Sequence, residues 1–347
     1  MIIQDGSRVC IVMLSSVGGA TWTLPVLNAI KRHAPLSHIT WIMQPGPASL
    51  VRGHPAVDDI VVLERKQGWR AFRDVRDVLR SRRFDVSLTL QVYLKAGIVT
   101  SFVQAPIKVG YDRARTKDAS WLFTNRRIPP RPRGHIQDEF LEFLAPIGVD
   151  PGPVEYAIGP CGEERAAQQR FYDSLDRPAA VIVVGTTNPE KDWPADRWAT
   201  VAEALRHDFG LEPVLAGGRS DRELAAEHIM RTRMSFAPRS TLGCPLRELV
   251  GIIDGAALVL SPDTGPLHLS VALERPVIGL YGYLDPRRVG PYRRYQDLLI
   301  DVHRNAPDEP VTTEQRRGRM ERISVRDVLD RVERWRTTYA SSRGPKA

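Results

Sequence analysis

A tight loop between two apolar runs carries residue types that bind anions. The loop reads Asp263-Thr264-Gly265, and His268 follows one helical turn later. Asp and Thr are favoured N-cap residues, and the exposed amides of a first helical turn attract negative charge. Because Thr264 and His268 are four residues apart, both can face one ligand from the same side of a helix. The spacing predicts an anion site, although an ordinary capped turn with a surface histidine would have the same local composition.

A second loop, Gly185–Pro194, combines two hydroxyls with a cation. The threonine hydroxyls of Thr186 and Thr187 can donate to phosphate oxygens, and the ammonium of Lys191 supplies a point charge. This combination favours binding of a diphosphate. An N-capping turn with a solvated lysine is the other interpretation.

The elements that position these loops alternate between strand and helix, which predicts a doubly wound α/β fold in each half of the chain. The proline- and glycine-rich stretch near residue 150 separates the halves. We expect an N-terminal domain at 1–150, a linker at 151–162, a second domain at 163–320, and a C-terminal helix with a disordered tail at 321–347. Strands are expected at 8–14, 38–43, 57–63, 85–90, 107–110, 179–184, 213–216, 257–260 and 277–280. Helices are expected at 21–33, 68–82, 93–102, 135–147, 195–209, 221–230, 245–254, 266–273 and 325–339, with a breaker at 44–47 and a loop at 287–295.

Composition narrows the class of protein. The chain has 347 residues and a net charge of +8, which favours anionic partners. Cys10, Cys161 and Cys244 have neither metal-type nor disulfide-type spacing, and nucleic-acid-binding motifs are absent from the sequence. No apolar run has the length of a membrane span, and the N-terminus does not have the pattern of a secretory signal. We therefore expect a cytoplasmic protein.

The whole pattern resembles glycosyltransferase family 9, the heptosyltransferase family of lipopolysaccharide assembly. The resemblance runs from Ile11 to about Tyr295 and implies a GT-B fold, with two facing Rossmann-like domains and an interdomain cleft. The residues that carry it are Asp263-Thr264-Gly265, His268, Ala272-Leu273, Pro276, Tyr281-Gly282, Thr186-Thr187, Lys191 and Trp193-Pro194.

The resemblance implies inverting transfer of a sugar, with ADP-heptose as the expected donor and a saccharide on a lipid-linked core as the acceptor. Lys191 would stabilise negative charge on the departing nucleotide. No metal or other cofactor is expected. The expected partners are the ADP-sugar, an anionic glycolipid or oligosaccharide and the inner face of the cytoplasmic membrane, but not nucleic acid. The implied donor-binding residues are Thr186, Thr187, Lys191, Asp221, Asp263, Thr264, Gly265 and His268, although a helix dipole explains Asp221 equally well.

The N-terminal loop departs from the family pattern. Gly19 stands where the family has an aspartate thought to be the general base, and a positioned base contributes about 10²–10⁴-fold to a rate. Three explanations compete: a substitution in an otherwise ordinary enzyme, another acid such as Asp112, or a sugar-nucleotide-binding protein without efficient turnover. A transferase that uses a different nucleotide sugar is a further alternative. The acceptor-side residues implied by the resemblance are Ser15, Ser16, Gly18, Asp112 and Arg113.

Overall fold

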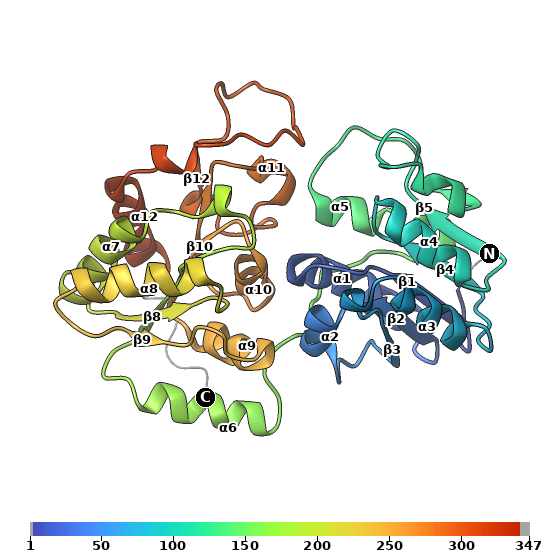
Figure 1. Cartoon of the computed structure of the whole chain (residues 1–347), viewed down its shortest axis with the longest axis horizontal. Coiled ribbons are helices and arrows are strands. Elements are labelled where there is room, and N and C mark those ends of the chain that lie inside the picture. Colours follow the sequence, from blue (N-terminus) through green and yellow to red (C-terminus); the bar gives the residue numbers. More distant parts are fainter. Residues whose placement is uncertain (1–2, 341–347) are drawn as a thin grey trace. The chain divides into compact units, whose positions relative to one another are not determined.

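A computed structural model describes residues 3–340 and divides the chain into two compact units, 1–158 and 159–347 (Figure 1). Each unit contains one parallel six-stranded sheet covered by helices. The predicted α/β organisation in two halves is therefore confirmed.

The first unit is built on a sheet of order β3-β2-β1-β4-β5-β6. Chain order leads from β1 outward to β3 and then returns to β4 on the other side of β1, so the strand order reverses between β1 and β4. In such sheets ligands bind at the carboxyl ends of the strands beside the reversal. The elements are β1 (Arg8–Val12), α1 (Val17–His33), β2 (His38–Met43), α2 (Pro45–Val51), β3 (Asp59–Val62), η1 (Arg65–Gln67), α3 (Trp69–Leu79), β4 (Val86–Thr89), α4 (Leu94–Phe102), β5 (Ile107–Gly110), η2 (Ser120–Phe123), β6 (Arg126–Arg127), α5 (Ile136–Leu141) and η3 (Ala145–Ile147).

The second unit repeats this plan with the order β12-β11-β10-β7-β8-β9. Its reversal lies between β7 and β10, which pair directly through Leu258 and Ala180. The elements are α6 (Glu163–Asp173), β7 (Ala179–Val183), η4 (Pro189–Lys191), α7 (Ala195–His207), β8 (Glu212–Ala216), α8 (Asp221–Arg233), β9 (Arg239–Ser240), α9 (Leu246–Gly255), β10 (Leu258–Pro262), α10 (Gly265–Ala272), β11 (Val277–Tyr281), α11 (Pro286–Val289), η5 (Gln296–Leu298), β12 (Ile300–Asp301), η6 (Met320–Arg322) and α12 (Val325–Thr338).

Apolar side chains on both faces of the sheets form the cores. The central strands β1, β7, β10 and β11 are buried almost throughout, as expected for parallel strands covered by helices on both faces. In the first unit, α3 contributes Ala71, Val75 and Leu79 from one helical face to a cluster that also contains Ala96 and Val99 of α4. The loops at the carboxyl ends of the strands are therefore anchored to a well-packed core.

Several expected elements were wrong. The stretch 44–47 is not a breaker but the start of α2, because a proline in the first turn needs no N–H and fits the helical φ. The single helix expected at 135–147 is two pieces, α5 and η3, since Pro146 has no N–H to bond the carbonyl four residues earlier. Helix α6 was missed, and the expected loop at 287–295 contains most of α11. The tail expected at 340–347 lies, from residue 341 onward, outside the described residues.

Candidate functional site

Lys191 and Asp263 meet at the carboxyl edge of the second sheet. Lys191 ends η4, which follows β7, and Asp263 follows β10, so both leave adjacent strands at the reversal of strand order. The Nζ of Lys191 donates to Oδ2 of Asp263 at 2.6 Å and lies 3.3 Å from the Asp263 carbonyl oxygen. His268, on α10, places Nε2 3.6 Å from the other carboxylate oxygen. Three of the predicted donor-side residues are thus brought together.

The Asp263 carboxylate is buried and interacts strongly with Lys191 and His268. Burial alone would raise the pKa of Asp263, but the charges and hydrogen bonds of Lys191 and His268 outweigh it and lower that pKa below its usual value. The Asp263 side chain is 7% exposed and that of Lys191 is 19% exposed, so the carboxylate is inside and the ammonium lies nearer to solvent. A carboxylate would repel a diphosphate. We therefore assign Asp263 to positioning Lys191 and His268 rather than to direct contact with phosphate.

The loop after β7 is held by a network that sequence reasoning missed. Asp192 accepts hydrogen bonds from the backbone N–H of Thr186 at 2.8 Å and from its hydroxyl at 2.9 Å. Arg222, on α8, forms an ion pair with Asp192 and donates to the Thr186 carbonyl at 3.0 Å. Burial raises the pKa of Asp192 despite these contacts. The Thr186 hydroxyl, predicted to contact phosphate, is engaged within the loop itself.

Glu223 joins the loops after β7 and β8. Its carboxylate accepts from the backbone N–H groups of Gly218 at 2.6 Å and Ser220 at 3.0 Å, completing a capping box at the start of α8. A Cβ on Gly185 would lie 2.6 Å from the Glu223 side chain, and one on Gly218 would lie 2.8 Å from its Oε2. Glycine is therefore required at both positions for this close approach.

The first turn of α10 has no capping side chain. Thr264 is the N-cap residue, but its hydroxyl makes no capping hydrogen bond. Pro266 has no N–H, and Thr264 and Gly265 are partly exposed beside Lys191 and Asp263. The predicted positions of Thr264 and Gly265 at a helix start are confirmed in geometry, and this end of the helix carries partial positive charge.

Two further predicted donor residues are exposed. Thr187 is exposed in the loop after β7, and Asp221 is exposed at the first position of α8. On α8, the neighbours Arg222 and Glu223 make the contacts to the loops instead. A sequence signal was present for Glu223, because Ser220 and Glu223 have the spacing of a capping box.

In the first unit, the loop after β1 carries the predicted acceptor-side serines. Gln91, which follows β4, accepts from Leu14 N–H at 3.1 Å and donates to the Ser15 carbonyl and hydroxyl at 3.1 and 3.2 Å. Ser16 is the N-cap of α1 and accepts from Gly19 N–H at 3.2 Å. This loop is therefore held at the reversal between β1 and β4, and Gln91 is a further residue that the sequence did not suggest.

Gly18 and Gly19 lie in the first turn of α1, and both are buried. A Cβ on Gly19 would overlap the terminal methyl group of Met13. Met13 itself is 6% exposed. A thioether thus fills the space into which a side chain at position 19 would extend.

Asp112 is not available as a substitute base. Its Oδ1 accepts from Ala114 N–H at 2.9 Å, and its Oδ2 accepts from Nε of the buried Arg115 at 2.5 Å. Arg115 also donates to Glu142 at 2.8 Å; burial opposes its charge, but hydrogen bonds to Glu142 and Asp112 raise its pKa. Both carboxylate oxygens of Asp112 are therefore engaged in an ion network within the first unit, and its place on the acceptor side stays a prediction. Arg113 remains exposed, with its guanidinium 4.1 Å from the centre of the Trp121 ring.

The pattern of the family Glycosyltransferase family 9 (heptosyltransferase) matches residues 72–316, which is most of the chain. This chain belongs to glycosyltransferase family 9. It is therefore a glycosyltransferase.

Two curated relatives agree with that membership. The chain is 29% identical over 310 residues to lipopolysaccharide core heptosyltransferase OpsX of Haemophilus influenzae, covering 89% of this chain and 88% of that protein. It is 29% identical over 321 residues to lipopolysaccharide heptosyltransferase 1 of Salmonella typhimurium, covering 88% and 98%.

Two solved structures resemble the fold. A family 9 glycosyltransferase from Veillonella parvula has a TM-score of 0.77 and 23% identity, covering 95% of this chain and 97% of that one. Escherichia coli heptosyltransferase WaaC with ADP has a TM-score of 0.73 and 24% identity, covering 96% and 99%. The predicted GT-B class, built from two Rossmann-like units, is confirmed.

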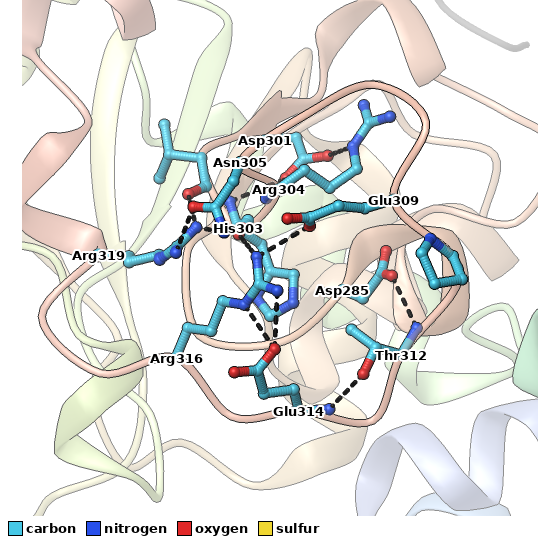
Figure 2. Close-up of polar contacts among 12 residues, drawn as sticks. Asp285, Asp301, His303, Arg304, Asn305, Glu309, Thr312, Glu314, Arg316 and Arg319 are labelled. Carbon is cyan, nitrogen blue, oxygen red and sulfur yellow. Dashed lines mark hydrogen bonds and ion pairs between the residues drawn. The ribbon is translucent and has the colours of Figure 1, made fainter.

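In this family 9 chain, a polar network fixes the segment that follows β12 (Figure 2). Arg316 donates to the His303 carbonyl at 2.6 Å and pairs with Glu309 at 3.0 Å, while Arg319 donates to Asn305 at 2.6 Å. Thr312 N–H donates to Asp285, in the loop after β11, at 3.1 Å. The segment is thereby tied to the same carboxyl edge that carries Lys191.

Within residues 3–340, no cluster of three or more His, Cys, Asp or Glu side chains has the arrangement of a metal site. Across the same described residues, no helix is both long enough and apolar enough to cross a bilayer.

Proposed function

We propose that this glycosyltransferase transfers heptose from ADP-heptose to a saccharide of the lipopolysaccharide core. The observation that carries the proposal is the ammonium of Lys191, held by buried Asp263 beside the start of α10. The names of the relatives support the reaction, since both curated proteins cited above are lipopolysaccharide heptosyltransferases. The ADP in the WaaC structure supports an adenine nucleotide as the leaving group.

The chemistry assigned to the site is a single displacement with inversion. An acceptor hydroxyl attacks the anomeric carbon, the bond from that carbon to the diphosphate breaks, and ADP departs with the electron pair. Negative charge grows on the diphosphate as the bond breaks. A cation fixed in advance at that point stabilises the transition state more than the ground state, which is the requirement for acceleration.

Lys191 is suited to this task because its position is set before substrate binds. Asp263 fixes the ammonium through a 2.6 Å contact, and the 19% exposure of the lysine leaves it accessible to a ligand. The uncapped first turn of α10 adds partial positive charge nearby. We propose that these groups supply the charge stabilisation without a divalent metal.

The acceptor is proposed to be anionic and lipid-linked, and the chain is proposed to act at the inner face of the cytoplasmic membrane. The lipopolysaccharide relatives and the net charge of +8 support this assignment. Arg113, exposed in the first unit, is the proposed acceptor contact.

A calorimetric titration with ADP in EDTA tests the donor site, and a transfer assay with ADP-heptose and a deacylated core oligosaccharide tests the reaction. We expect saturable one-to-one ADP binding and transfer in the absence of metal. Binding of UDP or GDP in preference to ADP would replace the proposed donor. Dependence of both binding and transfer on added Mg²⁺ would refute the metal-independent mechanism.

A second candidate function rests on the Met13–Gly19 contact. If the acceptor hydroxyl lacks a base, the chain would bind the sugar nucleotide but transfer it slowly. The two assays separate the candidates, because tight ADP binding without turnover on an acceptor used efficiently by a relative would favour the binding protein.

A further inference from the structure

The starts of α3 and α4 carry an unusual combination of exposed aromatic rings and cations. Trp69 is 79% exposed and Tyr93 is 49% exposed, although tryptophan is among the more buried residue types on average. Arg65, Lys66 and Arg70 are exposed around Trp69. None of these three cations has an ion pair within the described range 3–340. We call these residues, together with Leu122, the α3–α4 surface.

These residues share one face because of how the unit is built. Helix α3 follows β3 and α4 follows β4, so both helices begin at the carboxyl edge of the same parallel sheet. The two helices pack against each other (Figure 1), and Val75 of α3 and Val99 of α4 belong to one core cluster. Their exposed first turns therefore lie at the edge that also carries the loop of Ser15 and Ser16.

The η2 segment is joined to the start of α4. The Ser120 hydroxyl and the Lys117 N–H each donate to the Val92 carbonyl at 2.8 Å. A Cβ on Gly97 would lie 2.5 Å from the Phe123 ring, so glycine lets η2 approach the helix closely. This packing holds η2 against α4, and Leu122 of η2 is 63% exposed.

Lys117 adds a cation directly to this group. Its Nζ lies 5.6 Å from the centre of the Tyr93 ring. Trp69, by contrast, rests on Phe72, with ring centres 5.7 Å apart, and Phe72 packs on the core cluster. The outer face of the indole therefore projects from a rigid base rather than from a flexible loop.

We propose that the α3–α4 surface binds an anionic lipid bilayer. Tryptophan and tyrosine concentrate at the level of lipid headgroups, where an apolar ring and a polar N–H or O–H are both accommodated. Clustered Lys and Arg beside them are attracted to anionic headgroups. The aromatic rings of the α3–α4 surface therefore suit the headgroup layer of a bilayer, and its cations suit anionic headgroups.

The inference deepens the proposed function and rests on its lipid-linked acceptor. A bilayer in contact with the carboxyl edge of the first sheet would present its anchored saccharide to the loop after β1. The surface consists of residues of the first unit, whereas Lys191 and Asp263 belong to the second unit. Loss of lipid binding should therefore leave ADP binding unchanged.

Vesicle sedimentation tests the proposal with the full chain. The probes are vesicles of phosphatidylcholine and phosphatidylglycerol at 3:1 and vesicles of phosphatidylcholine alone, each at 50 and 500 mM NaCl. We expect binding to the anionic vesicles at low salt that weakens at high salt. Neutralising two cations in Lys66→Gln/Arg70→Gln should weaken partitioning roughly 25-fold, about fivefold for each cation.

Matched controls separate this surface from general charge and general hydrophobicity. Arg170→Gln/Arg233→Gln removes two exposed cations from the second unit, and Leu36→Ala removes an exposed apolar side chain from the connection between α1 and β2. Both control variants should bind vesicles like the parent. Lipids brominated near the headgroup should quench tryptophan fluorescence in the parent and quench it less in Trp69→Phe.

The results of the vesicle experiments can be told apart from those of the ADP titration. Equal vesicle binding by the parent and the Lys66/Arg70 variant would overturn the proposal, as would equal binding to neutral and anionic vesicles. Stronger binding of a single-stranded oligonucleotide, lost in the same variant, would assign the surface to nucleic acid instead. Failure of ADP to bind, with lipid binding intact, would refute the donor assignment but leave this surface standing.

Discussion

The loop after β7 brings a lysine against a buried aspartate, whereas the loop after β1 brings a methionine methyl group against a glycine. Both loops lie beside a reversal of strand order in a six-stranded parallel sheet. The shared fold therefore determines where a site lies, but the side chains determine whether charge is present there. In this chain, the proposed donor-side edge carries a fixed cation, while position 19 on the proposed acceptor side carries no carboxylate.

Restoring an acid on the acceptor side should produce the largest effect. Gly19 lies in the first turn of α1, where an aspartate suits the helix dipole, and the obstacle is the Met13 methyl group. If the missing base limits turnover, Gly19→Asp combined with Met13→Ala should raise kcat by about 10²–10⁴-fold. A steady-state assay of sugar transfer to a soluble acceptor measures this change in kcat.

The single variants sharpen this test. Met13→Ala alone should leave kcat near that of the parent because it adds no base. Gly19→Asp alone should gain less than the double variant, since Met13 must move aside. If the double variant folds, binds ADP and still gains nothing, position 19 does not limit the reaction.

Removing the donor-side cation should produce the next largest effect. Lys191→Ala deletes the charge proposed to stabilise the departing diphosphate and leaves Asp263 buried without its lysine partner. We expect kcat to fall by about 10²–10³-fold, in the range for loss of one fixed group that stabilises transition-state charge. Lys95→Ala, which removes an exposed lysine from the first unit, is the matched control. A loss confined to KM would place Lys191 in ground-state binding alone.

The Asp263 carboxylate should reveal itself in the pH dependence of stability. Its pKa is lowered in the folded chain by Lys191 and His268 despite burial, so folding favours the charged form. The stabilisation is therefore present above the ordinary pKa of an aspartate and lost as pH falls through the lower folded-state value. Breaking the pair in Asp263→Asn should cost about 1–3 kcal/mol near neutral pH, less than a fully buried pair because Lys191 reaches solvent.

Urea unfolding of the parent and Asp263→Asn between pH 3 and pH 7 checks this sign. The difference in unfolding free energy should be constant at the upper end and shrink toward the acid end. A difference that grows as pH falls would contradict the charged state assigned to Asp263.

Strand positions could be predicted from the sequence, whereas contacts between distant residues could not. Runs of apolar residues predicted the bounds of several strands closely. The strands β2 and β5 match their expected bounds, and β7 differs by one residue. Lys191 and Asp263 were both selected as site residues, but their contact spans 72 positions and depends on the adjacency of β7 and β10. Local pattern therefore identified the residue types, while the proposed division into a phosphate contact (Lys191) and a positioning group (Asp263) depends on the tertiary structure.

Arg222 shows the same limit. It is 30 positions from Asp192, and nothing in its local sequence distinguishes it from the other arginines of α8. The predicted donor residue was its neighbour Asp221, whose carboxylate is exposed. Met13 was likewise invisible as a partner of Gly19, because an apolar residue at a strand end usually signals only core packing.

The smallest expected effect concerns Arg222, which acts on Lys191 only through the loop. Arg222→Ala removes the ion pair to Asp192 and the 3.0 Å contact to the Thr186 carbonyl. Since Arg222 is 41% exposed, we expect little change in global stability but about tenfold weaker ADP binding from a loosened loop. Calorimetry measures the affinity, and Arg233→Ala on the same helix is the control.

A rescue experiment separates positioning from a direct ligand contact. Arg222→Lys keeps the charge but cannot reach both Asp192 and the Thr186 carbonyl with a planar fork, so it should recover only part of the affinity. Adding Arg222→Ala to Lys191→Ala should then cost less than it does in the parent, because a loosened loop no longer carries the cation. Full additivity would show that Arg222 acts independently of Lys191. The fixed charge of the donor edge would then depend on Asp263 alone.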